Sequence, residues 1–473
     1  SEGHCVDNSA DLDRKFVWHP FTQMRDWMRE EPIVIASGKG ATLTDTKGNT
    51  YLDGNSSIWT NLHGHANPLI NKAVVSQLKQ ISHSSALGLA NVPAAHFARD
   101  LVEATNCGFP GKNQFSKVFY SDDGSTAMEV ALKLSYEHSR RSGQSKKPFF
   151  LSLKGGYHGD TVGAVSLGSI DLFHKTYKNL LFKTDTTEAP YCYRCPYNRA
   201  KPQRADARTY VKCGKECLGS LEKKVASQAK TKQPFTAFVY EPVIQGAAGM
   251  IAQPKGWLKS AAEITKSHGL QLIADEIMTG FCRTGPLLAS HKEGVAPDFV
   301  SLAKGITGGY LPMAATLTTE TVFNSFLGEY GEFKSFFHGH SYTGNQLGAA
   351  AGQASLDLLK SGKSESQRAA LENQLRTSLT MLWESPFVGD IRQEGTVIGV
   401  ELVRDWKTRE AFSLTDKAGI RVCQKMAQLG VLTRPIGNVI VLMPPYCTTA
   451  RQADKMVFAL SHAIQSELGN RPL

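Results

Sequence analysis

The stretch Phe299-Val-Ser-Leu-Ala-Lys304-Gly-Ile-Thr-Gly-Gly-Tyr310 is an apolar run that ends in one lysine and is followed at once by glycines. This pattern predicts a buried strand that delivers Lys304 to a loop at its carboxyl end. The upstream stretch Gln271-Leu-Ile-Ala-Asp275 has the same design but ends in an acid. Because open α/β sheets bind ligands beyond the carboxyl ends of their strands, we expect both side chains at one crevice.

A lysine and an aspartate delivered to one crevice are the two groups that pyridoxal phosphate (PLP) requires. The lysine amine forms a Schiff base with the cofactor, and the carboxylate keeps the pyridine nitrogen protonated. On these two segments alone, an ordinary Asp–Lys pair at a sheet edge is the simpler interpretation. The choice between the two therefore depends on the rest of the chain.

Composition limits the class of protein. A chain of 473 residues with 41% hydrophobic residues can bury a large core and suggests two or three structural units. No run of about 18 uninterrupted apolar residues is present, so no membrane span is expected. The start of the sequence lacks the basic and apolar regions of a secretory signal, and the nine cysteines are spread along the chain. Both features favour a reducing compartment, and we expect a cytoplasmic protein.

The formal charge of +10 is concentrated in one segment. Residues 194–232 contain eleven lysines and arginines against three acids. A single basic segment of this kind is usually a solvated local patch, and no nucleic-acid-binding motif accompanies it. We therefore expect no nucleic-acid partner.

Other predicted strands also end in polar residues or glycines. Lys117–Ser121 is followed by Asp122-Asp-Gly-Ser125 and a helix, an arrangement that can bind an anion with backbone N–H groups. The strand near residues 149–153 leads to Gly155-Gly-Tyr-His-Gly-Asp160, and the strand near 237–240 leads to Glu241. Strands that alternate with helices in this way predict a mostly parallel sheet.

With Lys304, the run Asp275-Glu-Ile-Met-Thr-Gly-Phe-Cys-Arg-Thr-Gly285 resembles the class III, fold type I PLP-dependent aminotransferases, with further motifs in order almost end to end. The resemblance implies an α/β fold. Its large domain (56–360) has a mostly parallel, seven-stranded-type sheet flanked by helices and carries the basic, cysteine-containing insert at about 190–232. Its small α+β domain is built from both termini (1–55 and 361–473).

The resemblance also implies roles for individual residues. Lys304, Asp275 and Tyr157 are implied to be catalytic, with the Tyr157 ring stacked on the pyridine ring. The residues implied to bind the cofactor are Gly124, Ser125, Tyr157, His158, Glu241, Asp275, Lys304, Ser341 and Thr343. Ser341 or Thr343 is implied to reach the partner's cofactor phosphate, so a homodimer with shared active sites is expected. Asp123 stands where many relatives have serine or asparagine, and its carboxylate must point away from the phosphate or be neutralised.

Within the family, four segments are most similar to the diaminopelargonate aminotransferases of biotin synthesis: Trp18–Met24, Asp53–Trp59, Gly156–Thr161 and Leu442–Tyr446. The implied reaction converts 8-amino-7-oxononanoate to 7,8-diaminononanoate in two half-reactions. The residues implied to bind substrate are Phe21, Ile58, Trp59, Tyr157, Asp160, Gly339, Arg434 and Val441. Arg434 suits a bidentate bond to a substrate carboxylate.

The amino donor is expected to be S-adenosylmethionine, the usual donor of this subfamily, or lysine. Phe21 and Val441 stand for tyrosines and Ile58 for a second tryptophan, so groups that could contact adenosylmethionine are missing. We therefore expect lysine to serve as well or better.

Two other functions remain open. Another ω-amino aminotransferase, acting on ornithine, 4-aminobutyrate or a diamine, would share Asp275 and Lys304. A non-catalytic PLP-sensing regulator would need an appended helix-turn-helix, for which the chain leaves no obvious room.

The insert contains Cys192-Tyr-Arg-Cys195 and Cys213-Gly-Lys-Glu-Cys217. These spacings resemble a structural zinc or iron–sulfur site, and a metal would help to fold a polar segment with little apolar content. The alternatives are free thiols on an insertion loop, with at most one disulfide, or a redox pair. Any metal here is expected to be structural.

Overall fold

The structure is a computed structural model that describes residues 8–111 and 113–469. The first residues of the chain, where we expect no secretory signal, lie outside the described part. Within that part, no helix is long and apolar enough to cross a membrane.

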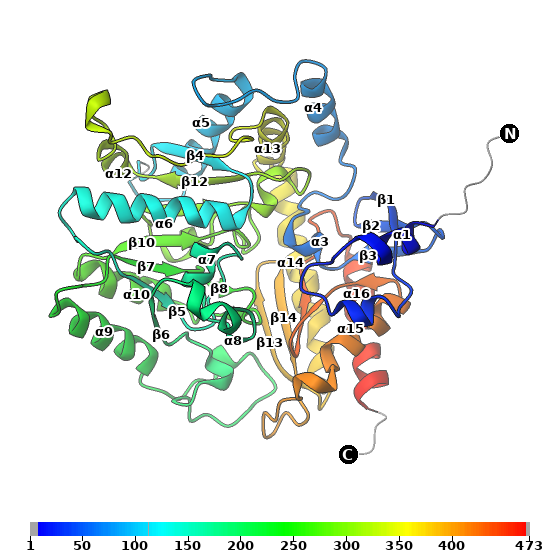
Figure 1. Cartoon of the computed structure of the whole chain (residues 1–473). Helices are drawn as coiled ribbons and strands as arrows, with labels where there is room; N and C mark the ends of the chain where they lie inside the picture. The colour runs from blue at the N-terminus through cyan, green and yellow to red at the C-terminus, as the bar shows by residue number, and fades with distance from the viewer. Residues whose placement is uncertain (1–7, 112, 470–473) are drawn as a thin grey trace.

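A seven-stranded sheet with the order β4-β12-β11-β10-β7-β5-β6 forms the centre of the molecule (Figure 1). Neighbouring strands are parallel, except that β12 runs antiparallel to both β11 and β4. This confirms the predicted mostly parallel sheet. The strands are β4 (Lys117–Ser121), β5 (Phe150–Leu153), β6 (Asp185–Thr187), β7 (Ala237–Tyr240), β10 (Gln271–Asp275), β11 (Phe299–Leu302) and β12 (Ala314–Thr318).

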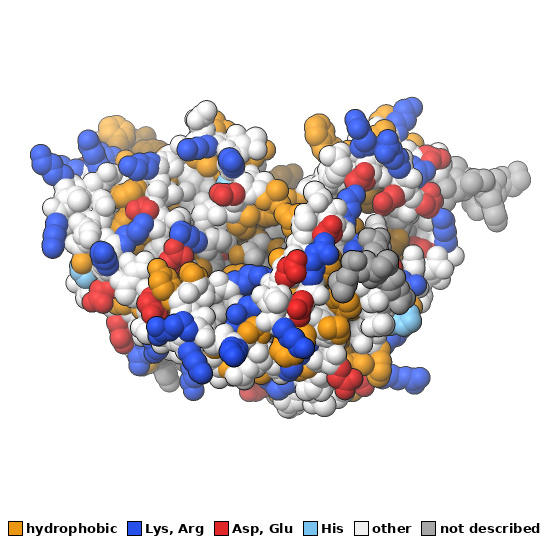
Figure 2. All heavy atoms as spheres, turned by 90° about the horizontal axis from the view of Figure 1, so that it is seen from below, with side chains coloured by type: hydrophobic (Ala, Val, Ile, Leu, Met, Phe, Trp, Pro, Cys, Tyr) orange, Lys and Arg blue, Asp and Glu red, His pale blue; other side chains and the backbone are white. Residues whose placement is uncertain are grey.

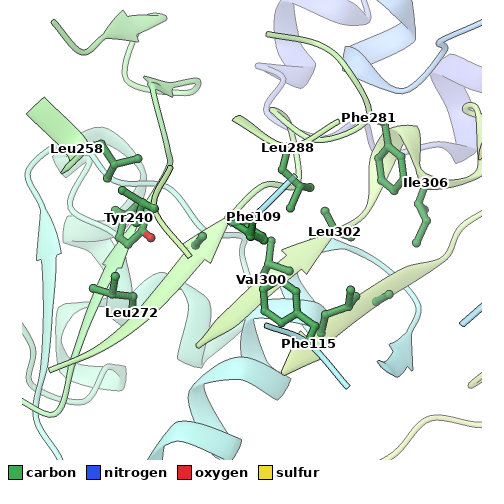
Figure 3. Close-up of a cluster of buried hydrophobic side chains, with 14 of the residues drawn as sticks. Phe109, Phe115, Tyr240, Leu258, Leu272, Phe281, Leu288, Val300, Leu302 and Ile306 are labelled. Atoms are coloured by element: carbon green, nitrogen blue, oxygen red, sulfur yellow. The ribbon is translucent and has the colours of Figure 1, made fainter. Parts of the chain in front are cut away.

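Helices cover both faces of this sheet, which is why its central strands are apolar throughout. Ile273 and Phe299 pack against α6 (Gly124–Arg141), which lies in front of the sheet in Figure 1. Alternate residues of the same strands, such as Leu272 and Val300, point to the opposite face. Figure 3 shows part of that second core, where Tyr240, Leu272, Val300 and Leu302 meet Phe109, Phe115, Leu258 and Leu288.

The other helices flank the sheet or belong to the terminal segments. They are α1 (Ser9–Phe16), α2 (Met24–Trp27), α3 (Ser56–Trp59), α4 (Pro68–Leu78), α5 (Val92–Cys107), α7 (Val162–Leu167), α8 (Asp171–His174), α9 (Glu216–Ala229), α10 (Trp257–Ser267), α11 (Ala289–Glu293), α12 (Glu320–Asn324), α13 (Gln346–Leu359), α14 (Gly362–Leu379), α15 (Ala418–Gln428) and α16 (Ala450–Leu468).

Two four-stranded sheets are built from the terminal segments, and a two-stranded sheet lies beside the central one. In the first, β3 of the N-terminal segment pairs in parallel with β15 of the C-terminal segment, so the two segments share one sheet. The second sheet packs its apolar face against α14, α15 and α16. We propose the division into segments 1–55, 56–360 and 361–473 on the basis of these pairings. The strands are β1 (Ile35–Lys39), β2 (Thr42–Asp45), β3 (Thr50–Asp53) and β15 (Val431–Leu432); β13 (Val388–Glu394), β14 (Val397–Leu402), β17 (Val439–Leu442) and β16 (Pro435–Ile436); and β8 (Ile244–Gln245) with β9 (Ile251–Ala252).

The basic insert is held against the C-terminal segment by its own arginines. Arg194 Nε donates to Glu401 Oε2 at 2.6 Å, and Arg208 Nη1 donates to Glu394 Oε1 at 2.5 Å. Arg204 donates to three backbone carbonyls in the segment 383–388. On the face seen in Figure 2, lysines and arginines are interspersed with acids and apolar side chains. Several of the basic residues are therefore structural rather than a purely solvated patch.

The insert also has a small apolar core of its own. Tyr193, Ala207 and Tyr210 are buried together with Val403 and pack against Trp406. Docking on the C-terminal segment therefore gives the insert an apolar core that its polar composition did not predict.

The four insert cysteines give the metal hypothesis no support. Among the described residues, no group of three or more histidine, cysteine, aspartate or glutamate side chains could hold a metal ion. Burial is the main cause that raises the pKa of Cys192 to about 12, and the three other insert cysteines raise it further. Burial also raises the pKa of Cys217, whose sulfur accepts a hydrogen bond from Trp257 Nε1 at 3.3 Å. Cys195 and Cys213 are likewise free thiols, and every described cysteine lacks a disulfide.

Candidate active site

The two polar strand ends lie side by side, because β10 and β11 are parallel neighbours with Asp275 opposite Ser301. Lys304 starts a short 3-10 turn directly after β11, with a left-handed φ of 48°. A left-handed lysine is strained by about 1–2 kcal/mol relative to its usual conformation. Gly308, at φ 67°, ends the turn. The backbone is thus strained at the residue expected to be catalytic.

A cavity of about 790 Å³ opens at this edge of the sheet. It contains Lys304, Asp275, Tyr157, Gly124 and Ser125, so five residues from four separate motifs are brought together. The full lining is Trp59, Thr60, Asp122, Asp123, Gly124, Ser125, Tyr157, His158, Gly159, Asp160, Thr161, Glu241, Ala247, Asp275, Ile277, Met278, Ala303, Lys304, Gly309, Tyr310, Leu311, Pro312 and Met313.

Asp275 is held rigidly at the floor of the cavity. Its Oδ1 accepts the Ile277 N–H at 3.0 Å, and its Oδ2 lies 2.7 Å from His158 Nδ1. Burial opposes a charge on His158, but the hydrogen bond and the negative charge of Asp275 outweigh it and raise the pKa of the imidazole. A buried carboxylate fixed in this way can hold a proton on a ring nitrogen that faces it.

Lys304 lies in an environment that favours the uncharged amine. Desolvation lowers its pKa to about 8, and the charge of Arg283 acts in the same direction, whereas Asp275 and Glu241 oppose the shift. The amine nitrogen lies 4.5 Å from the centre of the Trp59 ring. Burial also raises the pKa of Glu241 to about 7. An amine with a pKa near 8 is a better nucleophile and base at neutral pH than an ordinary lysine.

The segment that carries Trp59 has a backbone conformation that the sequence does not predict. Ser56, Ser57, Ile58 and Trp59 are all left-handed, with φ between 48° and 66°, although none is glycine. Ile58 is the most unusual of the four because its side chain is β-branched. Hydrogen bonds oppose the strain: the Ser57 N–H donates to Asp53 Oδ1 at 3.0 Å, and Ser56 Oγ donates to the Met443 carbonyl at 2.6 Å.

Tyr157 lines the cavity, and further aromatic rings pack behind it. Tyr157 donates its hydroxyl proton to Asp160 Oδ2 at 2.6 Å, and burial is the main cause of its raised pKa. The Phe173 ring lies edge-on both to Tyr157, at 6.1 Å, and to Phe21 of the N-terminal segment, at 5.1 Å. Phe173 was not predicted as a site residue. Its signal was only its place in a polar segment after the Tyr157 loop.

The opposite end of the cavity is formed by the start of α6. A side chain at Gly124 would place its Cβ 2.7 Å from an Ile277 methyl group, so only glycine fits there. Asp123 caps the helix: its Oδ1 accepts the Thr126 N–H at 2.8 Å. This hydrogen bond directs the Asp123 carboxylate toward the first turn of α6, where the helix N-terminus stabilises its negative charge.

Several predicted residues do not line the cavity as the structure describes it. Val441 is buried in an apolar cluster with Met278, and Arg434 is exposed. Phe21 reaches the site only through Phe173, and the Ile58 side chain is 47% exposed. The loop with Gly339, Ser341 and Thr343 lies away from it: His83 Nε2 donates to the Ser341 carbonyl, and Thr343 Oγ1 accepts from the His340 N–H.

Other residues that line the cavity were not predicted from the sequence. Ile277 lies two residues beyond Asp275 on the same strand end, which is a usable signal. Leu311, Pro312 and Met313 follow the glycines after Lys304, and no local pattern marks them. Thr161, inside a quoted motif, was not given a role.

The side chains present fit pyridoxal phosphate. A lysine with a lowered pKa, a fixed carboxylate, a tyrosine ring and a glycine-serine helix start are the groups its aldehyde, ring nitrogen, ring face and phosphate would need.

The chain belongs to the class-III aminotransferases, whose family pattern it matches over residues 24–464. It is 46% identical to the adenosylmethionine-8-amino-7-oxononanoate aminotransferase of Geobacter sulfurreducens over 459 residues, which cover 97% of this chain and 98% of the relative. The crystal structure of the enzyme with that name from Methanocaldococcus jannaschii has a TM-score of 0.88 at 38% identity, covering 97% of this chain and 98% of that one. A PLP-bound amine transaminase from an uncultivated Pseudomonas species has a TM-score of 0.86 at 32% identity, covering 95% and 98%.

Proposed function

We propose that this protein binds pyridoxal phosphate and transfers an amino group to 8-amino-7-oxononanoate, giving 7,8-diaminononanoate. The observation that carries the proposal is the meeting of Lys304 and Asp275 in one cavity. The near full-length similarity to enzymes named for this acceptor supports the choice of substrate.

The bound cofactor supplies an aldehyde that exchanges amines and a ring that accepts electrons from the substrate carbon. Lys304 would hold the cofactor through its amine, and the amine, when free, would move a proton at the reacting carbon as a base and then as an acid. Asp275 would hold a proton on the ring nitrogen, and His158 fixes the Asp275 carboxylate for this role. Tyr157 would lie against one face of the cofactor ring, while Gly124 and Ser125 would hold its phosphate.

Arg434 is the proposed partner of the acceptor carboxylate. Its guanidinium is exposed and takes part in no ion pair among the described residues, so its donors remain available. Arg434→Lys keeps the charge but loses the bidentate geometry. It is expected to raise KM for the acceptor and to leave KM for the donor unchanged.

Lysine is the proposed second donor, serving as well as or better than adenosylmethionine. The support for this choice comes from the sequence alone: Phe21, Ile58 and Val441 lack the hydroxyls and the extra aromatic ring noted above. The test is amino transfer to 8-amino-7-oxononanoate with a panel of donors, and with ornithine, 4-aminobutyrate and diamines as competing substrates. Transfer from adenosylmethionine with none from lysine would refute the donor proposal, and transfer only among the competing substrates would refute the acceptor.

A homodimer with shared sites is also proposed. Large apolar side chains are exposed on two segments that touch through His83 and Ser341. They include Leu87 (92% exposed), Val92, Tyr330 (92%), Phe333 and Phe337. Covering them with a second copy would offset this exposure.

Subunit mixing tests the shared sites. A Lys304→Ala chain and a Ser341→Ala/Thr343→Ala chain are each expected to be weakly active alone. Mixed dimers should regain one intact site, and no gain on mixing would contradict the arrangement.

The free thiols of the described cysteines support a reducing, cytoplasmic location.

A further inference from the structure

Ser125, at the phosphate end of the cavity, is held by a chain of hydrogen bonds that continues behind the cavity wall. Its Oγ accepts the Thr161 N–H at 3.0 Å and lies 2.7 Å from Thr161 Oγ1. Thr161 Oγ1 in turn donates to Glu129 Oε1 at 2.6 Å. The same carboxylate oxygen accepts the Ala164 N–H at 2.9 Å. Ser125 and Glu129 are four residues apart and therefore share one face of α6.

The backbone of the Tyr157 loop lies directly on this face. A Cβ at Gly159 would fall 2.3 Å from Ser125 Oγ, and a Cβ at Gly163 would fall 2.2 Å from Glu129 Oε2. These distances leave no room for a water layer between the helix and the loop. Gly159 and Gly163 therefore let the loop seat Thr161 between Ser125 and Glu129.

The direction of the hydrogen bonds follows from the number of protons. An ionised carboxylate can only accept, so the single hydroxyl proton of Thr161 is used by Glu129. Thr161 Oγ1 can then only accept from Ser125. The chain runs from Ser125 through Thr161 to Glu129 and ends on a charged acceptor, which makes its last bond strong.

We propose that Glu129 is a positioning residue for the phosphate end of the site, an inference that rests on the proposed binding of pyridoxal phosphate. Glu129 fixes Thr161, and the Thr161 N–H fixes the oxygen of Ser125, so the Ser125 hydroxyl can exchange its bond to Thr161 Oγ1 for a bond to the phosphate without moving its oxygen. The same contacts tie α6 to the loop that carries Tyr157 and Asp160. Glu129 itself lies outside the cavity lining.

The competing interpretation is that Glu129 only caps α7, through the Ala164 N–H. The two roles differ in what they do to two ligands. If Glu129 positions the phosphate site, its replacement lowers the affinity for pyridoxal phosphate but not for pyridoxal, which has the same aldehyde and ring without the phosphate. If Glu129 is purely structural, its replacement lowers the affinity for both ligands equally, or lowers the melting temperature of the cofactor-free protein without changing either affinity.

The experiment titrates cofactor-free wild type, Glu129→Ala and Glu129→Gln with each ligand and measures Kd from the visible absorbance. Glu129→Ala is expected to raise the Kd for pyridoxal phosphate by about tenfold, which corresponds to the loss of one hydrogen bond to a charged group. The Kd for pyridoxal should change by less than about twofold, which is within the error typical of such comparisons. Glu129→Gln keeps the acceptor oxygen and should restore most of the loss.

A double-mutant cycle tests the path through Thr161. Thr161→Val removes the hydroxyl and keeps the N–H, while Thr161→Ser keeps both and serves as the control. Glu129→Ala in the Thr161→Val background should add little, because the shared bond is already lost. Equal losses for both ligands, or full additivity in the cycle, would overturn the inference. Failure of the wild type to bind pyridoxal phosphate would instead refute the proposed function.

Discussion

The lowered pKa of Lys304 leads to a measurable rate of cofactor capture. At pH 7.5 a pKa of about 8 leaves about a quarter of the amine uncharged, against about 0.1% for an ordinary lysine. Only the uncharged amine attacks an aldehyde. Lys304 should therefore present roughly 200-fold more nucleophile at this pH than an exposed lysine would.

The assay mixes cofactor-free protein with excess pyridoxal phosphate between pH 6 and pH 10.5 and follows the visible absorbance of the lysine-bound cofactor. Each rate is divided by the rate with a small primary amine, which removes the titration of the cofactor itself. After correction for the amine's protonation, the rate should rise about tenfold per pH unit below 8 and level off above it.

Variants separate the causes of the shift. Asp275 and Glu241 both raise the pKa of Lys304, opposing desolvation, so Asp275→Asn and Glu241→Gln should move the plateau to lower pH. A capture rate that still rises tenfold per unit at pH 10 would refute the reasoning, because it would mean that burial leaves this amine unperturbed.

Three further outcomes follow from the geometry. Asp275→Asn should retain the cofactor yet slow amino transfer by about 100-fold or more, and transfer at the wild-type rate would contradict the role of its charge. Arg392→Met leaves the buried acids Glu401 and Asp390 without their shared cation, so denaturant titration should show a loss of about 3–5 kcal/mol, with a smaller loss for the more exposed Arg194→Met. Ile58→Gly relieves a left-handed residue and should raise the unfolding free energy by up to about 1 kcal/mol; a large loss would show that the Ile58 side chain stabilises the turn.

Much of the large sheet could be predicted because its signals are local. A continuous apolar run followed by a polar residue marks both β10 and β11, and strand order in an α/β sheet places their ends together. The glycine-serine start of α6 was visible for the same reason.

The features that sequence patterns missed depend on distant contacts. The left-handed turn at Ser56–Trp59 contains no glycine, and it is held by Asp53 and by the Met443 carbonyl at the other end of the chain. The arginines of the insert looked like surface charge, because their partners Glu394 and Glu401 lie about 200 residues away. Neither arrangement leaves a mark in a short window of sequence.

The identity of the cofactor-bearing lysine is the most direct test of the whole account. The cofactor-loaded protein is reduced with borohydride, digested and analysed by mass spectrometry for the peptide that carries the reduced pyridoxyl group. The label should lie on Lys304 at about one per chain, and Asp275→Asn should carry it at the same position. A label on another lysine, or none on a protein that transfers amino groups, would contradict the assignment of this cavity as the active site.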